Sequence, residues 1–288
     1  MSMRLPSRRM SDVGNPAALY LDLIKKTLAY TLWEEPGVPI ETFNYNRPPL
    51  RRALFSAMSW VSRRLGLQVL RDVQYTPEQR ANGAVMPMHA HTMIGLKRLD
   101  NLQFCIEDAL RNRVPGDLIE TGVWRGGACI LMRAVLAAHG VTDRRVFVAD
   151  SFAGLPPPDV SSYPKDEGDV HHEQQFLEVS RREVEENFRL YGLLDSQVVI
   201  LEGWFKDTLP KAPTDAFCVM RLDGDMYQST IEALANLYPR LSPGGYCIID
   251  DYDIPRCREA VEDYRSDQRI VSPIRAIDQS GVFWQKQD

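Results

Sequence analysis

The chain has 288 residues, of which 44% are hydrophobic and 25% are charged. These shares are typical of a globular protein and exclude collagen-like and disordered chains. Length alone predicts one large domain or about two smaller ones. No apolar run approaches the roughly 18 residues that a membrane helix needs. The formal net charge of −5 argues against general nucleic-acid binding, which requires a cationic face.

The cysteines and the first residues both bear on the compartment. Five cysteines are present, an odd number with no C-x-x-C pair, which predicts reduced thiols rather than a disulfide framework or a zinc site. The segment MSMRLPSRRMSDVGNP is basic but no apolar stretch follows it, so it does not resemble a secretory signal. Both features predict a cytoplasmic protein. The cysteines are Cys105, Cys129, Cys218, Cys247 and Cys257.

The N-terminal part is expected to begin with a frayed segment, residues 1–16, which is rich in Arg, Ser and Pro. Residues 19–33 are predicted to form an amphipathic helix, and the Pro, Gly and Asn content of residues 34–49 predicts a loop. The apolar stripe predicted for this helix consists of Leu19, Leu23, Leu28 and Leu32.

Residues 51–70 are predicted to form a second helix with one apolar and one basic face. A basic helix can bind anionic membranes or partners, but a solvated face on a helix packed at the domain edge explains the same pattern. The apolar side would carry Leu54, Met58, Val61 and Leu65, and the basic side Arg51, Arg52, Arg63 and Arg64.

From about residue 94 onward, short apolar runs alternate with helical patterns. Continuous apolar strands separated by helices indicate a parallel sheet covered on both sides, which is an α/β fold. The tail is predicted to close with a hairpin through residues 279–281. The predicted strands are 117–120, 145–149, 198–201, 216–222 and 246–249, and the predicted helices are 94–112, 126–138, 173–191 and 227–240.

The end of the first predicted strand is a candidate ligand site, because ligands bind at the carboxyl ends of the strands in an open parallel sheet. This strand ends in Glu120-Thr121-Gly122, and Gly126 and Gly127 follow. Glycine here would let a ligand approach the backbone. The spacing matches neither the G-x-G-x-x-G fingerprint of dinucleotide-binding proteins nor a phosphate loop. A purely structural turn between strand and helix therefore remains open.

The ends of the next two strands carry residues that suit a nucleoside. Asp150 and Ser151 follow the second strand, and a carboxylate can accept both hydroxyls of a ribose. The structural alternative for Asp150 is a helix N-cap. After the third strand, Trp204 and Phe205 beside Gly203 suit the face of an adenine, although aromatic residues in such a place can equally be packing.

An acidic cluster is predicted after the fourth and fifth strands, where Asp223 and Asp225 end one strand and Asp250 and Asp251 end the other. On adjacent strands these carboxylates would repel one another unless a cation neutralised them. Hard oxygen donors with no His or Cys nearby in sequence favour Mg²⁺, or a relative such as Mn²⁺ or Ca²⁺. The alternative is a set of solvated carboxylates that cap loops.

A polar insertion over residues 161–175 is long enough to cover these strand ends as a lid. It contains His171 and His172, while His89 and His91 precede the first strand. Each of these histidines is more typical of a surface residue than of a proton carrier. No pattern of Ser, His and Asp for nucleophilic catalysis is found.

Five segments together resemble the macrocin O-methyltransferase family, and the resemblance spans about residues 85–285. This family contains S-adenosylmethionine-dependent sugar O-methyltransferases of macrolide and aminocoumarin antibiotic biosynthesis. The segments are DLIETGVWRGGACILM, VFVADSFAGLPPPD, LEGWFKDTLP, MRLDGDMYQST and LSPGGYCIIDDY.

The resemblance implies a fold and a domain organisation. The fold would be an α/β class I methyltransferase (Rossmann-like) sheet of seven mostly parallel strands with helices on both faces, the last strand antiparallel. Residues 1–90 would form an N-terminal helical extension that is partly lid and oligomer contact. Residues 91–288 would form the methyltransferase domain. Members are usually dimers or higher oligomers, so a homo-oligomer is expected.

The resemblance also implies roles for particular residues. Asp223, Asp250 and Asp251 would hold Mg²⁺, and Asp225 would be the general base. The S-adenosylmethionine contacts would be Met93, Glu120, Thr121, Gly122, Asp150, Ser151, Gly203 and Trp204.

The implied function is Mg²⁺-dependent transfer of a methyl group to a sugar hydroxyl of a glycosylated natural product. Two alternatives stay open: a catechol or phenol O-methyltransferase of the same fold, and a non-catalytic nucleoside-binding scaffold. The acidic cluster disfavours the scaffold, because clustered carboxylates would bring it no advantage. The glycine spacing disfavours a nicotinamide dehydrogenase.

Overall fold

The computed structural model describes residues 15–34, 37–41, 47–85 and 87–287. Nearly all of the segment expected to fray, residues 1–16, lies outside these ranges. Among the helices described, none combines the length and the apolar character needed to cross a bilayer.

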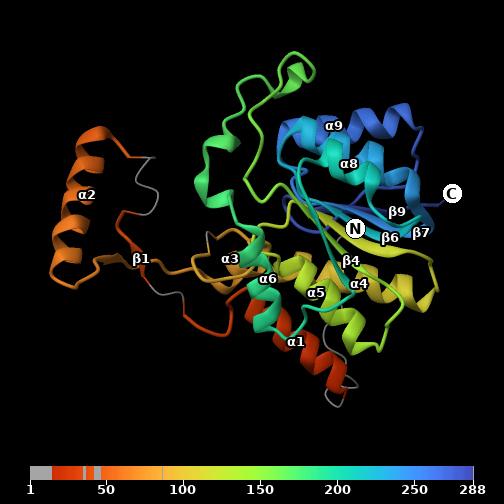
Figure 1. Ribbon diagram of the computed structural model, residues 1–288, viewed down its shortest axis with the longest axis horizontal. Coiled ribbons are helices and arrows are strands. Elements are labelled where there is room, and N and C mark those ends of the chain that lie inside the picture. Colours follow the sequence, from red (N-terminus) through yellow and green to blue (C-terminus); the bar gives the residue numbers. More distant parts are fainter. Residues whose placement is uncertain (1–14, 35–36, 42–46, 86, 288) are drawn as a thin grey trace.

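A single seven-stranded sheet lies at the centre of the described residues, in the order β5-β4-β3-β6-β7-β9-β8 (Figure 1). Strands β3 to β7 are parallel to one another, and β9 is antiparallel to both β7 and β8. The sheet and its closing hairpin confirm the sequence prediction. The strands are β3 (Asp117–Thr121), β4 (Val146–Asp150), β5 (Val198–Glu202), β6 (Phe217–Leu222), β7 (Leu241–Ile249), β8 (Arg275–Ala276) and β9 (Val282–Gln285).

Helices cover both faces of this sheet because successive strand side chains point to opposite sides. On β3, for example, Leu118 belongs to one core cluster and Ile119 to the other. One face packs against α1 (Pro16–Leu28), α4 (Leu96–Arg111), α5 (Gly127–Ala138) and α6 (Arg181–Leu190). The other packs against α7 (Phe205–Thr208), α8 (Tyr227–Leu237) and α9 (Pro255–Asp267).

Several predicted helix bounds differ from the observed ones for local reasons. Helix α6 starts at Arg181 rather than near 173, because Ser180 caps it and three short 3₁₀ turns precede it. It ends just before Gly192, a left-handed glycine, as predicted. Helix α8 ends at Leu237, since Pro239 converts the next turn into a 3₁₀ turn. Helix α9 was missed by the sequence analysis.

The stripe predicted to be buried on the first helix is largely wrong. Helix α1 begins at Pro16, behind the capping side chain of Asn15, and buries Leu21, Ile24 and Leu28. Of the predicted stripe only Leu28 is buried; the other three leucines are exposed. Leucines occur on more than one side of this segment, and the side that packs on α5 is chosen by tertiary contact.

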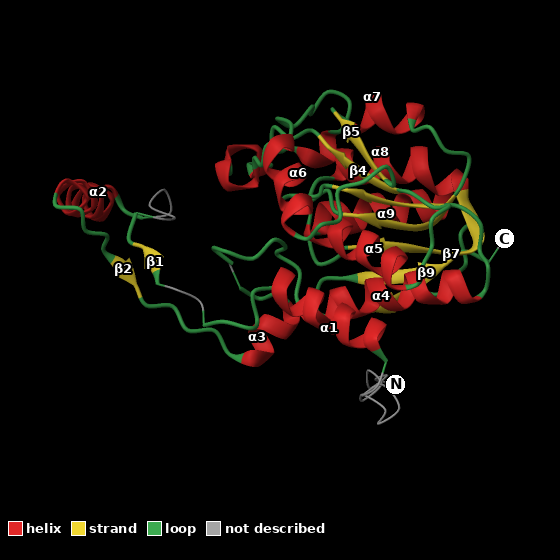
Figure 2. Cartoon of the chain, turned by 60° about the horizontal axis from the view of Figure 1, so that its bottom comes forward, coloured by secondary structure: helices red, strands yellow, loops and turns green. Residues whose placement is uncertain are grey.

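Helix α2 (Pro49–Arg64) does not pack on the edge of the main domain, contrary to the simpler sequence interpretation. It stands apart with a small ribbon of β1 (Val38–Pro39) and β2 (Leu70–Arg71), as Figures 1 and 2 show. Its buried residues are polar, Ser59 and Ser62. The apolar residues Leu50, Leu54, Met58, Val61 and Leu65 are all exposed.

The chain re-enters the main domain through α3 (Pro77–Asn82). Thr76 and Gln79 form a reciprocal capping box at its start, and Gly83 ends it in the left-handed conformation. Gly83 packs so closely on Gly95 that a Cβ at either position would clash with backbone of the other. This contact leads the chain past Met93 into α4.

Candidate active site

Three loops at the carboxyl edge of the sheet contain a non-glycine residue in the left-handed region. These are Trp124 after β3, Phe152 after β4 and Asp225 after β6, with φ values of 47°, 53° and 55°. Such conformations cost free energy and persist where the surrounding structure enforces them, often at functional sites. The carboxyl edge of the sheet, where ligands bind in folds of this topology, therefore also contains these strained backbone conformations.

A cavity opens along this edge. It brings together eight of the residues proposed from the sequence: Met93, Gly122, Asp150, Ser151, Gly203, Trp204, Asp223 and Asp225. Residues that the sequence analysis did not single out complete its wall, among them Trp124, Pro157, Leu177, Lys206, Gln228 and Glu232. No histidine is among the described lining residues.

Glu120 and Thr121 lie behind this wall rather than on it. Both side chains are buried, and the Glu120 carboxylate forms an ion pair with Arg221 and accepts a hydrogen bond from Cys129 Sγ at 2.9 Å. Burial raises the pKa of Glu120 against the opposing pull of Arg221. A ligand in the cavity would meet the backbone at Gly122 instead.

Gly122 is required by the close approach of two strand ends. Its φ is +76°, and a Cβ on it would lie 1.9 Å from the carbonyl oxygen of Asp223. The backbone N–H of Asp223 donates to the carbonyl of Thr121 at 3.0 Å. The glycine therefore brings the loop after β6, with Asp223, against the loop after β3.

The carboxylate of Asp150 accepts hydrogen bonds that shape the loops around it. Its oxygens accept the backbone N–H groups of Val123 and Phe152, both at 2.7 Å. Burial raises the pKa of Asp150 against these hydrogen bonds. Ser151 is held locally, donating to the carbonyl of Gly154 at 2.6 Å.

Met93 and Trp204 line the cavity from two segments that are far apart in the sequence. Met93 lies in a segment that packs on the start of α5, where the N–H of Gly127 donates to the carbonyl of His91 at 2.9 Å. A Cβ at Gly127 would lie 2.4 Å from that carbonyl oxygen. Trp204 follows β5 and leaves 37% of its surface exposed at the rim.

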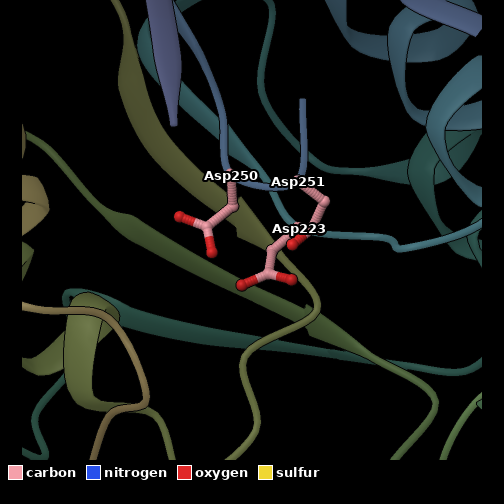
Figure 3. Close-up of side chains that lie close together, drawn as sticks. All are labelled: Asp223, Asp250 and Asp251. Carbon is pink, nitrogen blue, oxygen red and sulfur yellow. The ribbon is translucent and has the colours of Figure 1, made fainter. Parts of the chain in front are cut away.

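The carboxylates of Asp223, Asp250 and Asp251 converge, as predicted from the adjacency of β6 and β7 (Figure 3). Each offers one oxygen, and these oxygens all lie within 4.8 Å of one another. Asp225 is tied to the group through its backbone, since its N–H donates to Asp251 Oδ2 at 3.2 Å. Of the three, only Asp223 lines the cavity; the other two lie beside it.

The buried Arg221 and the partly buried Arg98 border this carboxylate cluster, and the sequence analysis missed both. Arg221 of β6 forms ion pairs with Asp223 at 3.1 Å and with Asp250 at 2.5 Å. Arg98 of α4 forms ion pairs with Asp250 at 2.7 Å and with Asp278 at 2.8 Å. Asp250 is therefore clamped from two sides.

The carboxylates of this cluster differ in the direction in which their pKa values are shifted. Burial, with the charges of Asp251 and Asp250, raises the pKa of Asp223 well above its usual range. Burial and the nearby Asp225 and Asp250 do the same to the pKa of Asp251. Burial and the charges of Asp223 and Asp250 raise the pKa of Asp225 to about 8. Asp250 differs, because its two arginine partners outweigh burial and lower its pKa.

The histidines and cysteines lie away from the cavity. His171 bonds to Asp169 through Nδ1 at 2.8 Å, and His91 bonds to the hydroxyl of Tyr191 at 2.8 Å. All five cysteines are free, in agreement with the predicted reduced thiols, and all five are buried. None of these residues is positioned as a nucleophile in the cavity.

The predicted lid borders the cavity with its two flanks. Gly154, Leu155, Pro156, Pro157 and Asp159 line it from one flank and Leu177 from the other. The indole N–H of Trp124 donates to the carbonyl of Phe176 at 2.9 Å, which ties the second flank to the loop after β3. None of residues 161–175 themselves lines the cavity, so the cover expected from this insertion stays a prediction.

The strand order, the antiparallel last strand and the cavity at the carboxyl edge define a class I methyltransferase fold. The solved structure of the O-methyltransferase NovP matches with a TM-score of 0.80 and 46% identity, covering 94% of this chain and 100% of that one. The calicheamicin methyltransferase CalS11 has the same fold at a TM-score of 0.56 and 18% identity, covering 75% of this chain and 95% of that one.

The chain belongs to the macrocin-O-methyltransferase family, whose model matches residues 17–286. It is 47% identical to demethyldecarbamoylnovobiocin O-methyltransferase of Streptomyces niveus, over 96% of each chain. It is 51% identical, over 92% of each chain, to the 8-demethyl-8-(2,3-dimethoxy-alpha-L-rhamnosyl)-tetracenomycin-C 4'-O-methyltransferase of Streptomyces olivaceus. The protein is therefore an O-methyltransferase, and the resemblance found in the sequence is confirmed.

Proposed function

We propose that this enzyme transfers the methyl group of S-adenosylmethionine to a sugar hydroxyl of a glycosylated natural product, as a tailoring step in antibiotic biosynthesis. The observation that carries the proposal is the convergence of Asp223, Asp250 and Asp251 beside a cavity with nucleoside-compatible strand ends. The tetracenomycin relative, whose name specifies a rhamnosyl group, supports a sugar acceptor.

The cavity wall fits S-adenosylmethionine. Asp150 lines the cavity with an ionisable carboxylate that backbone N–H groups hold in place, and a carboxylate is a suitable acceptor for ribose hydroxyls. Gly203 and Trp204 would border the adenine at the rim, and Met93 would contact the cofactor from the α4 side. Glu120 and Thr121 would act through the backbone at Gly122, since their side chains are buried behind it.

The carboxylate cluster fits a divalent cation. Its donors are all hard oxygens, and burial and mutual repulsion raise the pKa of two of them, so a bound cation would relieve a cost that the two arginines relieve only in part. We propose Mg²⁺ with Asp223, Asp250 and Asp251 as ligands. When bound, the cation would lower the pKa of a coordinated hydroxyl.

The protein's part in the reaction is then orientation and proton removal. The cofactor supplies a methyl group activated by positive sulfur, and holding two reactants in line can contribute about 7–11 kcal/mol. Asp225 lines the same cavity. Its left-handed backbone, together with the hydrogen bond from its N–H to Asp251, fixes the position from which its side chain extends. Its carboxylate would accept the proton of the acceptor hydroxyl, a task that suits a pKa near neutrality.

The test is mass spectrometry of labelled methyl transfer to three sets of acceptors: deoxysugar glycosides, glycosides blocked by prior methylation, and catechols. Product from glycosides that requires Mg²⁺ and disappears with chelator is expected. Product from catechols alone would instead establish the phenol O-methyltransferase alternative. Product from none of the three sets, with cofactor bound, would show that the acceptor belongs to another chemical class.

Asp225→Asn is expected to retain cofactor and metal affinity while turnover falls by about 10²- to 10⁴-fold, the usual contribution of a positioned base. Calorimetry of cofactor and Mg²⁺ binding, beside initial rates, checks both halves. Unchanged turnover would move the base to another group.

We also propose that residues 1–90 form an extension that contacts a second copy of the chain, while residues 91–288 carry the chemistry. The support is the exposed apolar side of α2, described above, since a contiguous apolar surface of this kind usually marks an interface. Contacts within the chain involve the polar side of the helix, where Ser59 and Ser62 are buried and Arg63 forms an ion pair with Glu41.

The double variant Leu54→Glu and Val61→Glu is expected to convert an oligomer into a species of lower mass, because two charges would be buried at the interface. Light scattering coupled to size exclusion measures the mass. Val271→Glu is the control, because Val271 is an exposed apolar residue of the main domain. An unchanged mass in the α2 variant would place the oligomer contact elsewhere.

A further inference from the structure

The start of helix α8 is capped by a residue from the lid, sixty-one positions away in sequence. Met226 occupies the N-cap position and offers no side-chain hydrogen bond. The side chain of Asp166 provides the missing cap. Its Oδ1 accepts a hydrogen bond from the N–H of Tyr227 at 2.8 Å, and its Oδ2 accepts one from the N–H of Gln228 at 2.9 Å. Asp166 is fully buried, with 0% of its surface exposed.

The capped turn follows directly after the acidic loop. Asp223 begins this loop at the end of β6, Asp225 holds a left-handed conformation, and Met226 is completely buried one residue before α8. Gln228 and Ser229, in the first turn of α8, line the cavity. The position of this turn therefore sets both the end of the acidic loop and one wall of the cavity.

Asp166 lies in a segment that we call the strap, residues 163–169, which further contacts attach to α8 and α9. Tyr163 donates from its hydroxyl to Glu232 at 3.1 Å, and Lys165 forms an ion pair with Asp263 at 2.5 Å. Arg256 donates to the carbonyl of Glu167 at 2.7 Å. Figure 1 shows this part of the lid, in green, beside α9.

We propose that Asp166 is a positioning residue for methyl transfer. It fixes the first turn of α8 and thereby holds Asp225 and the cavity wall formed by Gln228 and Ser229. The lid is consequently not a free flap: its middle, the strap, stays on α8 and α9, while its two flanks border the cavity. This inference rests on the proposed function for its kinetic consequence but not for its structural one.

The physical basis is the set of unpaired N–H groups at a helix start. A helix leaves its first N–H groups without intrahelical partners, and a carboxylate there satisfies them and interacts favourably with the helix dipole. In α8 no local side chain does this, so loss of Asp166 would leave two inward-facing N–H groups unpaired. The turn would then fray, and the acidic loop would lose its fixed end.

The structural arm of the test is residue-resolved amide hydrogen exchange on the protein without ligands. In Asp166→Ala, exchange at Tyr227 and Gln228 is expected to rise about 10-fold or more, as removal of a good cap permits. Asp166→Asn, which keeps one accepting oxygen, should be intermediate. Lys165→Met is the matched control, because it detaches the adjacent strap residue from α9 while Asp166 remains; exchange at the two amides should not change.

The kinetic arm separates positioning from simple attachment of the lid. For Asp166→Ala, kcat is expected to fall about 5- to 30-fold, the equivalent of a lost cap, with KM for the cofactor nearly unchanged. The Asn variant should recover part of this loss, and Lys165→Met should retain the wild-type kcat.

Three outcomes are decisive. Raised exchange at Tyr227 and Gln228, with graded kcat, supports the proposal. Raised exchange confined to residues 163–169, or equal kcat losses in Asp166→Ala and Lys165→Met, would overturn it. If the wild type transfers no methyl group to any acceptor, the proposed function fails, while the exchange data still decide whether Asp166 holds α8. The Asn variant serves this purpose should the Ala variant not fold.

Discussion

Asp223→Asn is expected to abolish metal binding and to lower turnover by about 10³-fold or more, since a catalytic metal contributes several kcal/mol. The same change should raise the melting temperature of the metal-free protein, by roughly 2–4 °C for each kcal/mol of repulsion removed. The reason is that Asp223 shares a partly buried site with two other carboxylates, and one oxygen of each lies within 4.8 Å of the others. The site is thus strained without a cation.

The pH dependence of stability follows with a definite sign. Asp223, Asp225 and Asp251 have raised pKa values in the folded chain, that of Asp225 about 8. Between the unfolded and folded pKa values the folded chain binds more protons, so the free energy of unfolding falls as pH rises. Metal-free protein should therefore lose stability from pH 5 toward roughly pH 8 through these groups.

Thermal melts with and without Mg²⁺ across this range measure both effects. Mg²⁺ should stabilise the wild type increasingly as pH rises, and should leave Asp223→Asn unaffected. A variant that melted lower than the wild type without metal, yet kept Mg²⁺-dependent turnover, would contradict the assignment of Asp223 as a ligand.

Gly122→Ala is expected to lower the free energy of unfolding by about 3 kcal/mol or more and to misplace Asp223. A left-handed non-glycine residue costs roughly 1–2 kcal/mol, and here the new Cβ would also meet the Asp223 carbonyl at 1.9 Å. The loop after β6 would have to move, so affinity for both metal and cofactor should fall.

Gly140→Ala isolates the conformational part of this cost. Gly140 has a φ of +65°, and no heavy atom lies within 4 Å of the place that a Cβ would take, so only the backbone penalty applies. Denaturant unfolding of both variants, with calorimetric Mg²⁺ titration, makes the comparison. Equal losses of stability in the two variants would show that the close approach at Gly122 can relax.

The sheet and the carboxylate cluster were predictable because both depend on short-range patterns and one topological rule. Continuous apolar runs such as Val146–Ala149 identify buried strands, and adjacent parallel strands bring Asp223 and Asp250 together. The sequence even contained a sign of the missed arginine. Arg221 interrupts an otherwise apolar strand, and a charged side chain in such a place must be paired.

Features that depend on distant segments could not be predicted in this way. Arg98 meets Asp278 across 180 positions, and Asp166 meets α8 across about sixty, with no local pattern in either case. The stripe of α1 was wrong for a related reason: Leu21 and Leu23 have equal hydrophobicity, and only the position of α5 decides which is buried. Tertiary contact, rather than periodicity, selects among equivalent local solutions.

Because all five cysteines are buried, the folded enzyme should react only slowly with thiol reagents. Burial raises the pKa of Cys218 to about 11, and it raises the pKa values of Cys105, Cys129, Cys247 and Cys257 well above the usual range. Since the thiolate is the reactive species, alkylation at neutral pH must wait until the chain opens. The rate of cysteine alkylation therefore reports the rate at which the chain opens, without the introduction of a label.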